Sequence, residues 1–190
     1  MHLYDHSKVG LETKLGEMLP VFANSDKKDI TFKELLSHYG RLQAWEPFYK
    51  STLDIEKCPA DKYYSLTYKQ GFTKQVAENL FIRDDYQDSI MSKIVSSKLI
   101  EKKEYKYSDF TFIILKDYVE KMTGKSLDVL SSEQFFKPLG MSSTMYNPLR
   151  KFDMSVIPPT ENDNYFRHTT IQGYVHDMTA AMQGGVGGHA

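Results

Sequence analysis

The clearest candidates for chemistry are Tyr107-Ser108-Asp109, directly before a strongly apolar segment from Phe110 to Met122. A tyrosine has an ordinary pKa of about 10, so it acts as a base near neutral pH only where cations or hydrogen bonds favour the phenolate. The start of a helix supplies part of that bias, because its unpaired amides and its dipole favour negative charge. Tyr107 is therefore a candidate catalytic residue, with Asp109 beside it on the same turn. The alternative is that Ser108 or Asp109 caps the helix and that Tyr107 packs its ring on the core.

A Ser-x-x-Lys spacing occurs at Ser25-Asp26-Lys27-Lys28. Where this pair performs chemistry, the lysine lies one helical turn from the serine and takes its proton. The segment from Asn24 to Asp29 is polar and charged, so we expect a solvated loop. Such a loop would not desolvate a lysine and lower its pKa. We therefore do not expect Ser25 to be a nucleophile.

The six histidines are scattered, without the H-E-x-x-H or paired Cys/His spacing of a zinc site. The sequence therefore predicts no metal and no cofactor. His176-Asp177 is a candidate substrate-binding pair, with a structural turn as the alternative. We expect His38 to hydrogen-bond the backbone near the end of a helix.

The composition is that of an ordinary globular protein, with 190 residues, 41% hydrophobic and 26% charged. Lysine and arginine total 24 against 25 acidic residues, so the formal charge of -1 gives no electrostatic reason to expect a nucleic acid or an anionic membrane as partner. The single cysteine, Cys58, excludes an internal disulfide. The longest apolar run covers only residues 112–115, and we expect neither a transmembrane helix nor a signal peptide.

Helical periodicity and end signals predict the elements that must position these side chains. The predicted helices are a turn over 15–19 before Pro20, a helix from a capping box at Thr31 and Glu34 to about His38 closed by Gly40, a helix after Asp84 or Asp85, a helix from the Tyr107 turn to Gly124, and a helix from Leu127 to about Phe136. The side chains expected to be buried in the last two are Phe110, Ile113, Ile114 and Tyr118, then Leu127, Leu130 and one or both of Phe135 and Phe136.

The remaining segments lack clear periodicity. Residues 41–80 are predicted to be an irregular excursion with one short strand near Val76 to Ile82. Residues 147–175 are predicted to be a long ordered loop in which Glu161, Asp163 and Arg167 are solvated charges.

An ordered series of segments accompanies the Tyr107 turn. Around it stand Tyr105 to Phe110, Ile113-Ile114-Leu115, Val119-Glu120-Lys121, Thr123 to Leu127 and Phe136 to Met141; before it stand Gly10-Leu11, Lys14-Leu15, Leu19-Pro20, Ile30-Thr31 and Leu35 to His38; after it stand Pro159 to Asn162, Gly173 to Asp177 and Gly184 to Ala190. Together they resemble serine β-lactamases and penicillin-binding proteins, with Tyr107-Ser108-Asp109 as the second active-site motif of that family. The later segments are similar to a branch in which this hydrolase domain is fused behind a family 3 glycoside hydrolase.

The resemblance implies an α/β parent fold with an antiparallel sheet flanked by helices. Residues 1–190 would be a single partial domain, mostly the helical subdomain of that fold, truncated at both ends. This fragment is expected to be mainly α-helical, with long loops and little sheet. The family's reacting serine would precede Met1, and the strand-edge motif that follows the glycine turn ending at His189-Ala190 would lie beyond the chain.

The implied mechanism proceeds through an acyl-serine intermediate without metal, with Tyr107 assisting proton transfer. Many family members carry asparagine where this chain has Asp109, and an ionised aspartate accepts hydrogen bonds without donating them. The resemblance makes Asp109 a second candidate catalytic residue, which would hold a lysine ammonium. Because the family's reacting serine would precede Met1, the chain alone is expected to be inactive. The substrate would be a small molecule or a peptidoglycan-type peptide, and the parent protein would lie in the periplasm or cell envelope.

A second hypothesis belongs to another class of protein. The chain would be a catalytically silent helical module that binds a partner or a glycan. The apolar face left by the missing sheet would then support self-association.

Overall fold

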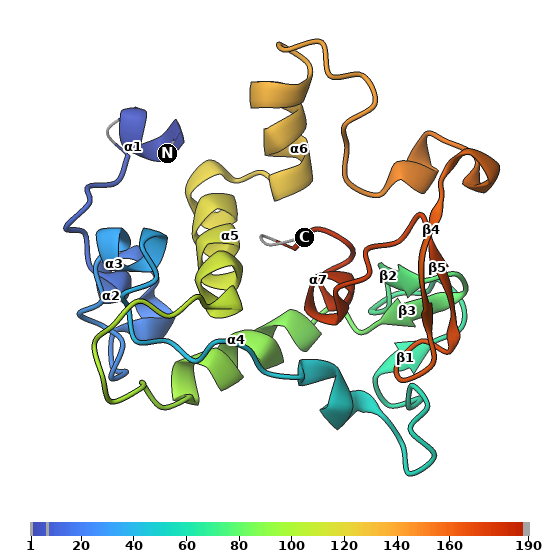
Figure 1. Cartoon of the computed structure of the whole chain (residues 1–190), viewed down its shortest axis with the longest axis horizontal. Helices are drawn as coiled ribbons and strands as arrows, with labels where there is room; N and C mark the ends of the chain where they lie inside the picture. The colour runs from blue at the N-terminus through green and yellow to red at the C-terminus, as the bar shows by residue number, and fades with distance from the viewer. Residues whose placement is uncertain (1, 7, 188–190) are drawn as a thin grey trace. The chain divides into compact units, whose positions relative to one another are not determined.

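The computed structural model describes residues 2–6 and 8–187, and Figure 1 traces its elements along the chain. The chain forms two compact units: the first comprises Met1–Glu46 and Ile90–Gly124, and the second comprises Pro47–Ser89 and Lys125–Ala190. The expectation of a single partial domain over residues 1–190 stays a prediction. In the described ranges, no helix is long and apolar enough to cross a membrane.

The first unit is built from helices. Its elements are α1 (His2–Asp5), α2 (Leu15–Met18), the 3-10 turn η1 (Pro20–Phe22), α3 (Phe32–Leu36), the later part of α4 (Tyr86–Ser96) and α5 (Asp109–Thr123). The side chains that fill its core include Leu15, Leu19, Phe22, Leu35, Ile94, Phe110 and Ile114. The predicted helical turn before Pro20 and the helix after Asp85 are confirmed.

The predicted capping box begins α3. Thr31 Oγ1 accepts a hydrogen bond from the Glu34 amide at 3.2 Å, and Glu34 Oε2 accepts one from the Thr31 amide at 2.9 Å. The predicted end of this helix is wrong, because α3 stops at Leu36 and the chain turns at His38 with a φ of 58°. A histidine, rather than Gly40, therefore takes the left-handed position after this helix.

Helix α5 confirms the pattern read from the sequence. Phe110, Ile113, Ile114 and Tyr118 are all buried. The helix is followed by Gly124, whose φ of 67° suits a glycine because it has no Cβ to clash in the left-handed region. This helix carries the Tyr107 turn at its N-terminal end.

The loop over residues 24–29 is present, but the expectation that it is solvated is wrong for Lys27. Its ammonium is fully buried and donates hydrogen bonds to Asp26 Oδ1 at 2.7 Å, to the Val95 carbonyl at 3.1 Å and to the Ser97 carbonyl. These two carbonyls lie at the C-terminal end of α4, where a cation is favoured by the helix dipole. The lysine thus closes that helix end.

The second unit contains two small antiparallel sheets. The first sheet has the order β1-β3-β2, formed by Tyr64–Ser65, Leu80–Ile82 and Lys74–Ala77, and the second pairs β4 (Pro159–Asp163) with β5 (Thr169–Gln172). The other elements are η2 (Phe48–Thr52), α6 (Leu127–Ser131), the π-helical turn η3 (Ser132–Phe136), η4 (Pro148–Arg150), η5 (Met154–Val156) and α7 (Met178–Met182). The prediction of little sheet agrees with these short strands.

Two segments contain more sheet than predicted. The single strand expected over 76–82 is two strands, because Glu78 and Asn79 form a two-residue turn in which Asn79 has a φ of 52°. The expected long loop over 147–175 contains the β4–β5 hairpin. Its first strand has the sequence Pro-Thr-Glu-Asn-Asp. These residues lack the alternating apolar pattern from which a strand is predicted.

The helix predicted over 127–136 exists, but its predicted burial is wrong. None of Leu127, Leu130, Phe135 and Phe136 is buried. The α-helical hydrogen bonding gives way to a π-helical turn after Ser131, and such a turn holds more residues than an α-helical one. Phe135 and Phe136 lie in this turn, so the spacing of 3.6 residues on which their burial was predicted does not hold there.

Candidate functional site

The turn at Tyr107-Ser108-Asp109 lies at the N-terminal end of α5. Ser108 takes the N-cap position with extended backbone, but its hydroxyl makes no hydrogen bond to the helix. The hydroxyl donates instead to the Gln43 carbonyl at 2.6 Å, and the Ser108 amide donates to Nδ1 of His38 at 3.3 Å. Ser108 is buried. Ser108 thus takes the N-cap position of the alternative, but its side chain ties the turn to another segment and does not cap the helix.

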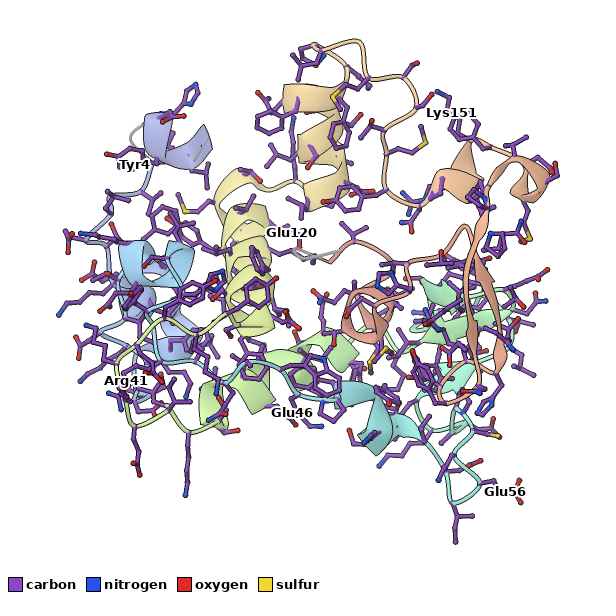
Figure 2. The ribbon with its side chains drawn as sticks, viewed as in Figure 1. Tyr4, Arg41, Glu46, Glu56, Glu120 and Lys151 are labelled. Carbon is purple, nitrogen blue, oxygen red and sulfur yellow. The ribbon has the colours of Figure 1, made fainter. Side chains whose placement is uncertain are left out.

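The segment that receives these bonds runs from His38 to Ala44. The Lys106 amide donates to the His38 carbonyl at 3.0 Å, and the Asp109 amide donates to the Ala44 carbonyl at 2.9 Å. Further along, Arg41, labelled in Figure 2, donates through Nε to the Ile100 carbonyl at 2.7 Å. The turn before α5 is consequently held from outside its own helix.

The ring of Tyr107 is about half exposed to solvent. Its exposed fraction is 48%, so the alternative in which the ring packs into the core does not hold. The Tyr107 ring centroid lies 4.6 Å from that of His38 and 5.8 Å from that of Phe112. The phenol ring thus has two aromatic neighbours.

The electrostatics of the turn favour the protonated phenol. Partial desolvation raises the pKa of Tyr107, and the nearby carboxylate of Asp109 and the phenol of Tyr105 raise it further. Asp109 therefore opposes the phenolate that a base at this position requires. A cation is needed beside Tyr107 before it can accept a proton near neutral pH.

The second predicted pair lies in the second unit, at the start of α7. Asp177 is the N-cap residue of that helix, and its Oδ1 accepts a hydrogen bond from the Ala180 amide at 2.7 Å. His176 is exposed, and its carbonyl accepts from the Arg167 guanidinium at 2.7 Å. A substrate-binding role for this pair stays a prediction. Asp177 has a capping role in the fold that the sequence analysis did not assign.

The expectation that the charged residues around the β4–β5 hairpin are solvated is wrong for Asp163 and Arg167. The Arg167 and Asp163 side chains are completely buried and form an ion pair at 2.7 Å, and Glu161 Oε1 lies 3.6 Å from the same guanidinium. Burial alone would raise the pKa of Asp163, but Arg167 and the amides of Phe166 and Tyr165 lower it overall. Burial, together with the acceptor Glu161, raises the pKa of Tyr165 to about 12.

The Ser-x-x-Lys spacing at Ser25 forms a tight turn. Ser25 Oγ donates to the Phe22 carbonyl at 2.9 Å and accepts from the Lys27 amide at 3.2 Å, while Lys28 is exposed. The serine is therefore occupied by backbone contacts and its lysine partner is solvated. No group of three or more His, Cys, Asp or Glu side chains suited to a metal occurs in the part of the chain that the structure describes.

Sequence reasoning missed the residues that hold the Tyr107 turn. Gln43 and Ala44 contribute only backbone carbonyls, which every residue has, so no side-chain pattern marks them. His38 was expected to hydrogen-bond the backbone near the end of its own helix, but its ring accepts from the Ser108 amide at the start of α5. The ring contact between His38 and Tyr107 joins residues far apart in the sequence, and no sequence pattern predicted it.

A known protein family matches most of the chain. The family model described as Beta-lactamase matches residues 1–156. The chain therefore belongs to the beta-lactamase family, and the Tyr107 turn falls within the matched region.

Two relatives match almost the whole chain. A protein of Escherichia coli (strain K12) named "Putative D-alanyl-D-alanine carboxypeptidase" is 30% identical over 99% of this chain and 42% of its own length. A protein of Bacillus subtilis (strain 168) named N-acetylmuramyl-L-alanine amidase is 31% identical over the same shares. The chain thus spans about two fifths of the length of these relatives.

Solved structures show the same fold at lower identity. The octameric penicillin-binding protein homologue from Pyrococcus abyssi matches 99% of this chain and 37% of its own, with a TM-score of 0.54 at 16% identity. FmtA from Staphylococcus aureus matches 98% of this chain and 41% of its own, with a TM-score of 0.53 at 18% identity. The fold of the chain is therefore like part of these larger proteins.

Proposed function

We propose that this chain is part of a serine hydrolase of the β-lactamase and penicillin-binding type, which acylates a serine with an amide or ester substrate. The observation that carries the proposal is the half-exposed Tyr107 at the head of α5, on a turn held by His38, Gln43 and Ala44 within the matched family region. A rigidly held, accessible phenol suits proton transfer to or from a reacting group.

In this proposal the nucleophile and its lysine belong to sequence before Met1. An ammonium brought close to Tyr107 would oppose the effects of Asp109 and Tyr105 on its pKa. Tyr107 would then relay the serine proton, and Asp109 would hold that ammonium. Residues 1–190 would be inactive alone, as a partial domain that is mostly the helical subdomain.

The proposed substrate is a cell-wall peptide. Its support is the names of two relatives, "Putative D-alanyl-D-alanine carboxypeptidase" and "N-acetylmuramyl-L-alanine amidase". His176 and Asp177 are proposed to contact that substrate. A periplasmic or cell-envelope location for the parent protein follows from the same proposal.

The test compares this chain with an extended protein, meaning the chain joined to its natural flanking sequence on both sides. A fluorescent penicillin and an activated ester are the probes. We expect covalent labelling of the extended protein and none of the short chain. Tyr107→Phe should slow labelling about 100-fold or more, in line with the loss of general acid–base assistance.

Tyr68→Phe is the matched control, because it also removes an exposed phenol and Tyr68 belongs to the second unit. It should label like the unmodified protein. Labelling of the short chain at Ser25, or normal labelling of the Tyr107→Phe variant, would contradict the proposal.

A second candidate function is a catalytically silent binding module. The observation that favours it is a set of exposed apolar side chains on and after α6, at Val129, Phe135, Leu139 and Met141, beside a hollow lined in part by Phe136 and Met145. Such a surface suits self-association or a partner. A natural sequence before Met1 with no Ser-x-x-Lys on a helix would favour this candidate over the hydrolase.

A further inference from the structure

His38 has an unusual backbone conformation next to the candidate site. Its φ of 58° lies in the left-handed region, which residues other than glycine rarely adopt and which persists only where neighbours hold it. The His38 amide donates to the Leu35 carbonyl at 3.2 Å, and its carbonyl accepts from the Lys106 amide at 3.0 Å. The backbone of His38 thus joins the end of α3 to the residue just before Tyr107.

The imidazole of His38 contacts the residue just after Tyr107. Its Nδ1 accepts a hydrogen bond from the Ser108 amide at 3.3 Å. An accepting nitrogen carries no proton, so the proton of the neutral ring is on Nε2. Both chain neighbours of Tyr107 are therefore bonded to this one histidine.

The rings around His38 restrict its movement and that of Tyr107. The His38 centroid lies 4.6 Å from that of Tyr107 at an interplanar angle of 39°. Phe112 lies 5.5 Å away at 60°, and Tyr105 lies 6.1 Å away at 88°. His38 is packed by aromatic rings in several directions, so its ring offers Tyr107 a fixed surface.

We propose that His38 is a positioning residue that sets the orientation of the Tyr107 phenol. This inference rests on the proposed function, in which Tyr107 transfers a proton. Proton transfer requires hydrogen-bond geometry, and a displacement of about 1 Å costs on the order of 100-fold in rate. The ring of His38 contacts the Tyr107 ring, while its carbonyl and its Nδ1 bond the amides of Lys106 and Ser108 on either side of Tyr107.

Two substitutions separate these contacts. His38→Gly keeps the left-handed backbone without strain and removes the whole side chain. His38→Asn tolerates the left-handed region and places an amide oxygen where Nδ1 accepts from Ser108, but it lacks the ring. In the extended protein we expect His38→Gly to lower the maximal rate of acylation about 100-fold, with less than about a threefold change in the probe concentration at half-maximal rate. His38→Asn should recover part of that loss.

His168 offers a matched control. It is a histidine with a similar left-handed φ of 51°, its Nε2 lies 3.0 Å from the Lys57 carbonyl, and it belongs to the second unit. His168→Gly makes the same chemical and backbone change in the other unit. It should acylate at the normal rate.

A second measurement does not depend on acylation. Titration of Tyr107 in the chain itself, followed by the NMR signal of its Cζ and assigned with Tyr107→Phe, reports the surroundings of the phenol. Removing the His38 ring lets water reach Tyr107, so His38→Gly should bring its raised pKa back toward about 10. His168→Gly should leave that titration unchanged.

The outcomes distinguish this inference from the proposed function. No labelling of the unmodified extended protein sinks the proposed function, while the Tyr107 titration still reports on His38. If that protein labels and Tyr107→Phe slows it, but His38→Gly labels at the normal rate, the positioning role is wrong. An unchanged Tyr107 titration in His38→Gly overturns the inference independently of activity.

Discussion

The turn before α5 and the turn before α7 each place a polar residue at a helix start, but they use it differently. At α5 the Ser108 hydroxyl donates away from its helix to the Gln43 carbonyl at 2.6 Å. At α7 the Asp177 carboxylate accepts from the Ala180 amide of its own helix at 2.7 Å. The first turn is held by a segment distant in sequence, whereas the second stabilises itself locally.

The two turns also differ in the charge of their support. Neutral hydrogen bonds and aromatic rings hold the α5 turn. The backbone before α7 is held by the buried guanidinium of Arg167, which bonds the Val175 and His176 carbonyls and pairs with Asp163. A turn tied by tertiary contacts can present an exposed side chain such as Tyr107, because no local bond depends on that side chain.

The largest effect is expected at the ion pair that supports the α7 turn. Asp163→Ala leaves the Arg167 guanidinium buried without its partner, which should lower the free energy of unfolding by about 3–5 kcal/mol in urea denaturation at neutral pH. Asp85→Ala breaks an exposed pair with Arg83 and should cost far less. Equal losses from the two variants would mean that the buried pair is not the support of the turn.

The same pair predicts a pH dependence. The pKa of Asp163 is lower in the folded protein than the unfolded value of about 3.9, so its contribution is fully present above that value and is lost as the pH falls through the folded pKa. The stability difference between the unmodified protein and Asp163→Ala should therefore shrink below about pH 4. A difference that stays constant into acid would contradict the assignment.

The next largest effect on stability is expected at the hydrogen bond from Ser108 that holds the α5 turn. Ser108→Ala removes a buried hydroxyl and leaves the Gln43 carbonyl without that donor, at a cost of about 1–2 kcal/mol in unfolding free energy. Ser37→Ala removes an exposed hydroxyl that donates to the Lys33 carbonyl within four residues, and it should cost less than about 0.5 kcal/mol. If the order is reversed, the α5 turn does not depend on its distant contact.

The local cap of α7 should have a smaller effect. Asp177→Ala removes the acceptor for the Ala180 amide and should cost about 1 kcal/mol, measured by urea denaturation and by faster hydrogen exchange at Ala180. Asp177→Ser keeps a capping oxygen and should restore most of the stability. A serine variant as unstable as the alanine variant would show that the negative charge, rather than the cap, matters.

The smallest effect on stability is expected at Tyr107 itself. Its ring is about half exposed, so Tyr107→Phe should change the unfolding free energy by less than about 0.5 kcal/mol. A loss above about 1 kcal/mol would show that the hydroxyl supports the fold and is not held for chemistry. Urea denaturation of the chain measures this directly.

The helices that position the site were predictable because their signals are local. The capping box at Thr31, the apolar stripe of α5 and the glycine after it each act within a few residues, and all three are present in the structure. The order of the quoted segments also indicated the beta-lactamase family, which the match over residues 1–156 confirms.

Several features were not predictable because their partners are distant or their residue types are misleading. The polar β4 strand looks like a loop until Thr169–Gln172 pairs with it. Lys27 and Arg167 look like surface charges, and each is buried only because carbonyls or a carboxylate elsewhere in the chain compensate its charge.

By itself, the sequence determined where α5 begins and which residue stands before it, since apolar periodicity is a property of neighbouring residues. Only the tertiary structure decided how Tyr107 is held. The contacts of Lys106, Ser108 and Asp109 with residues 38–44 close a loop of more than sixty residues, and backbone carbonyls that serve as acceptors carry no side-chain signature. Neighbouring residues therefore determine that a helix starts at the Tyr107 turn. Contacts with distant residues determine how the turn holds Tyr107 as a candidate site residue.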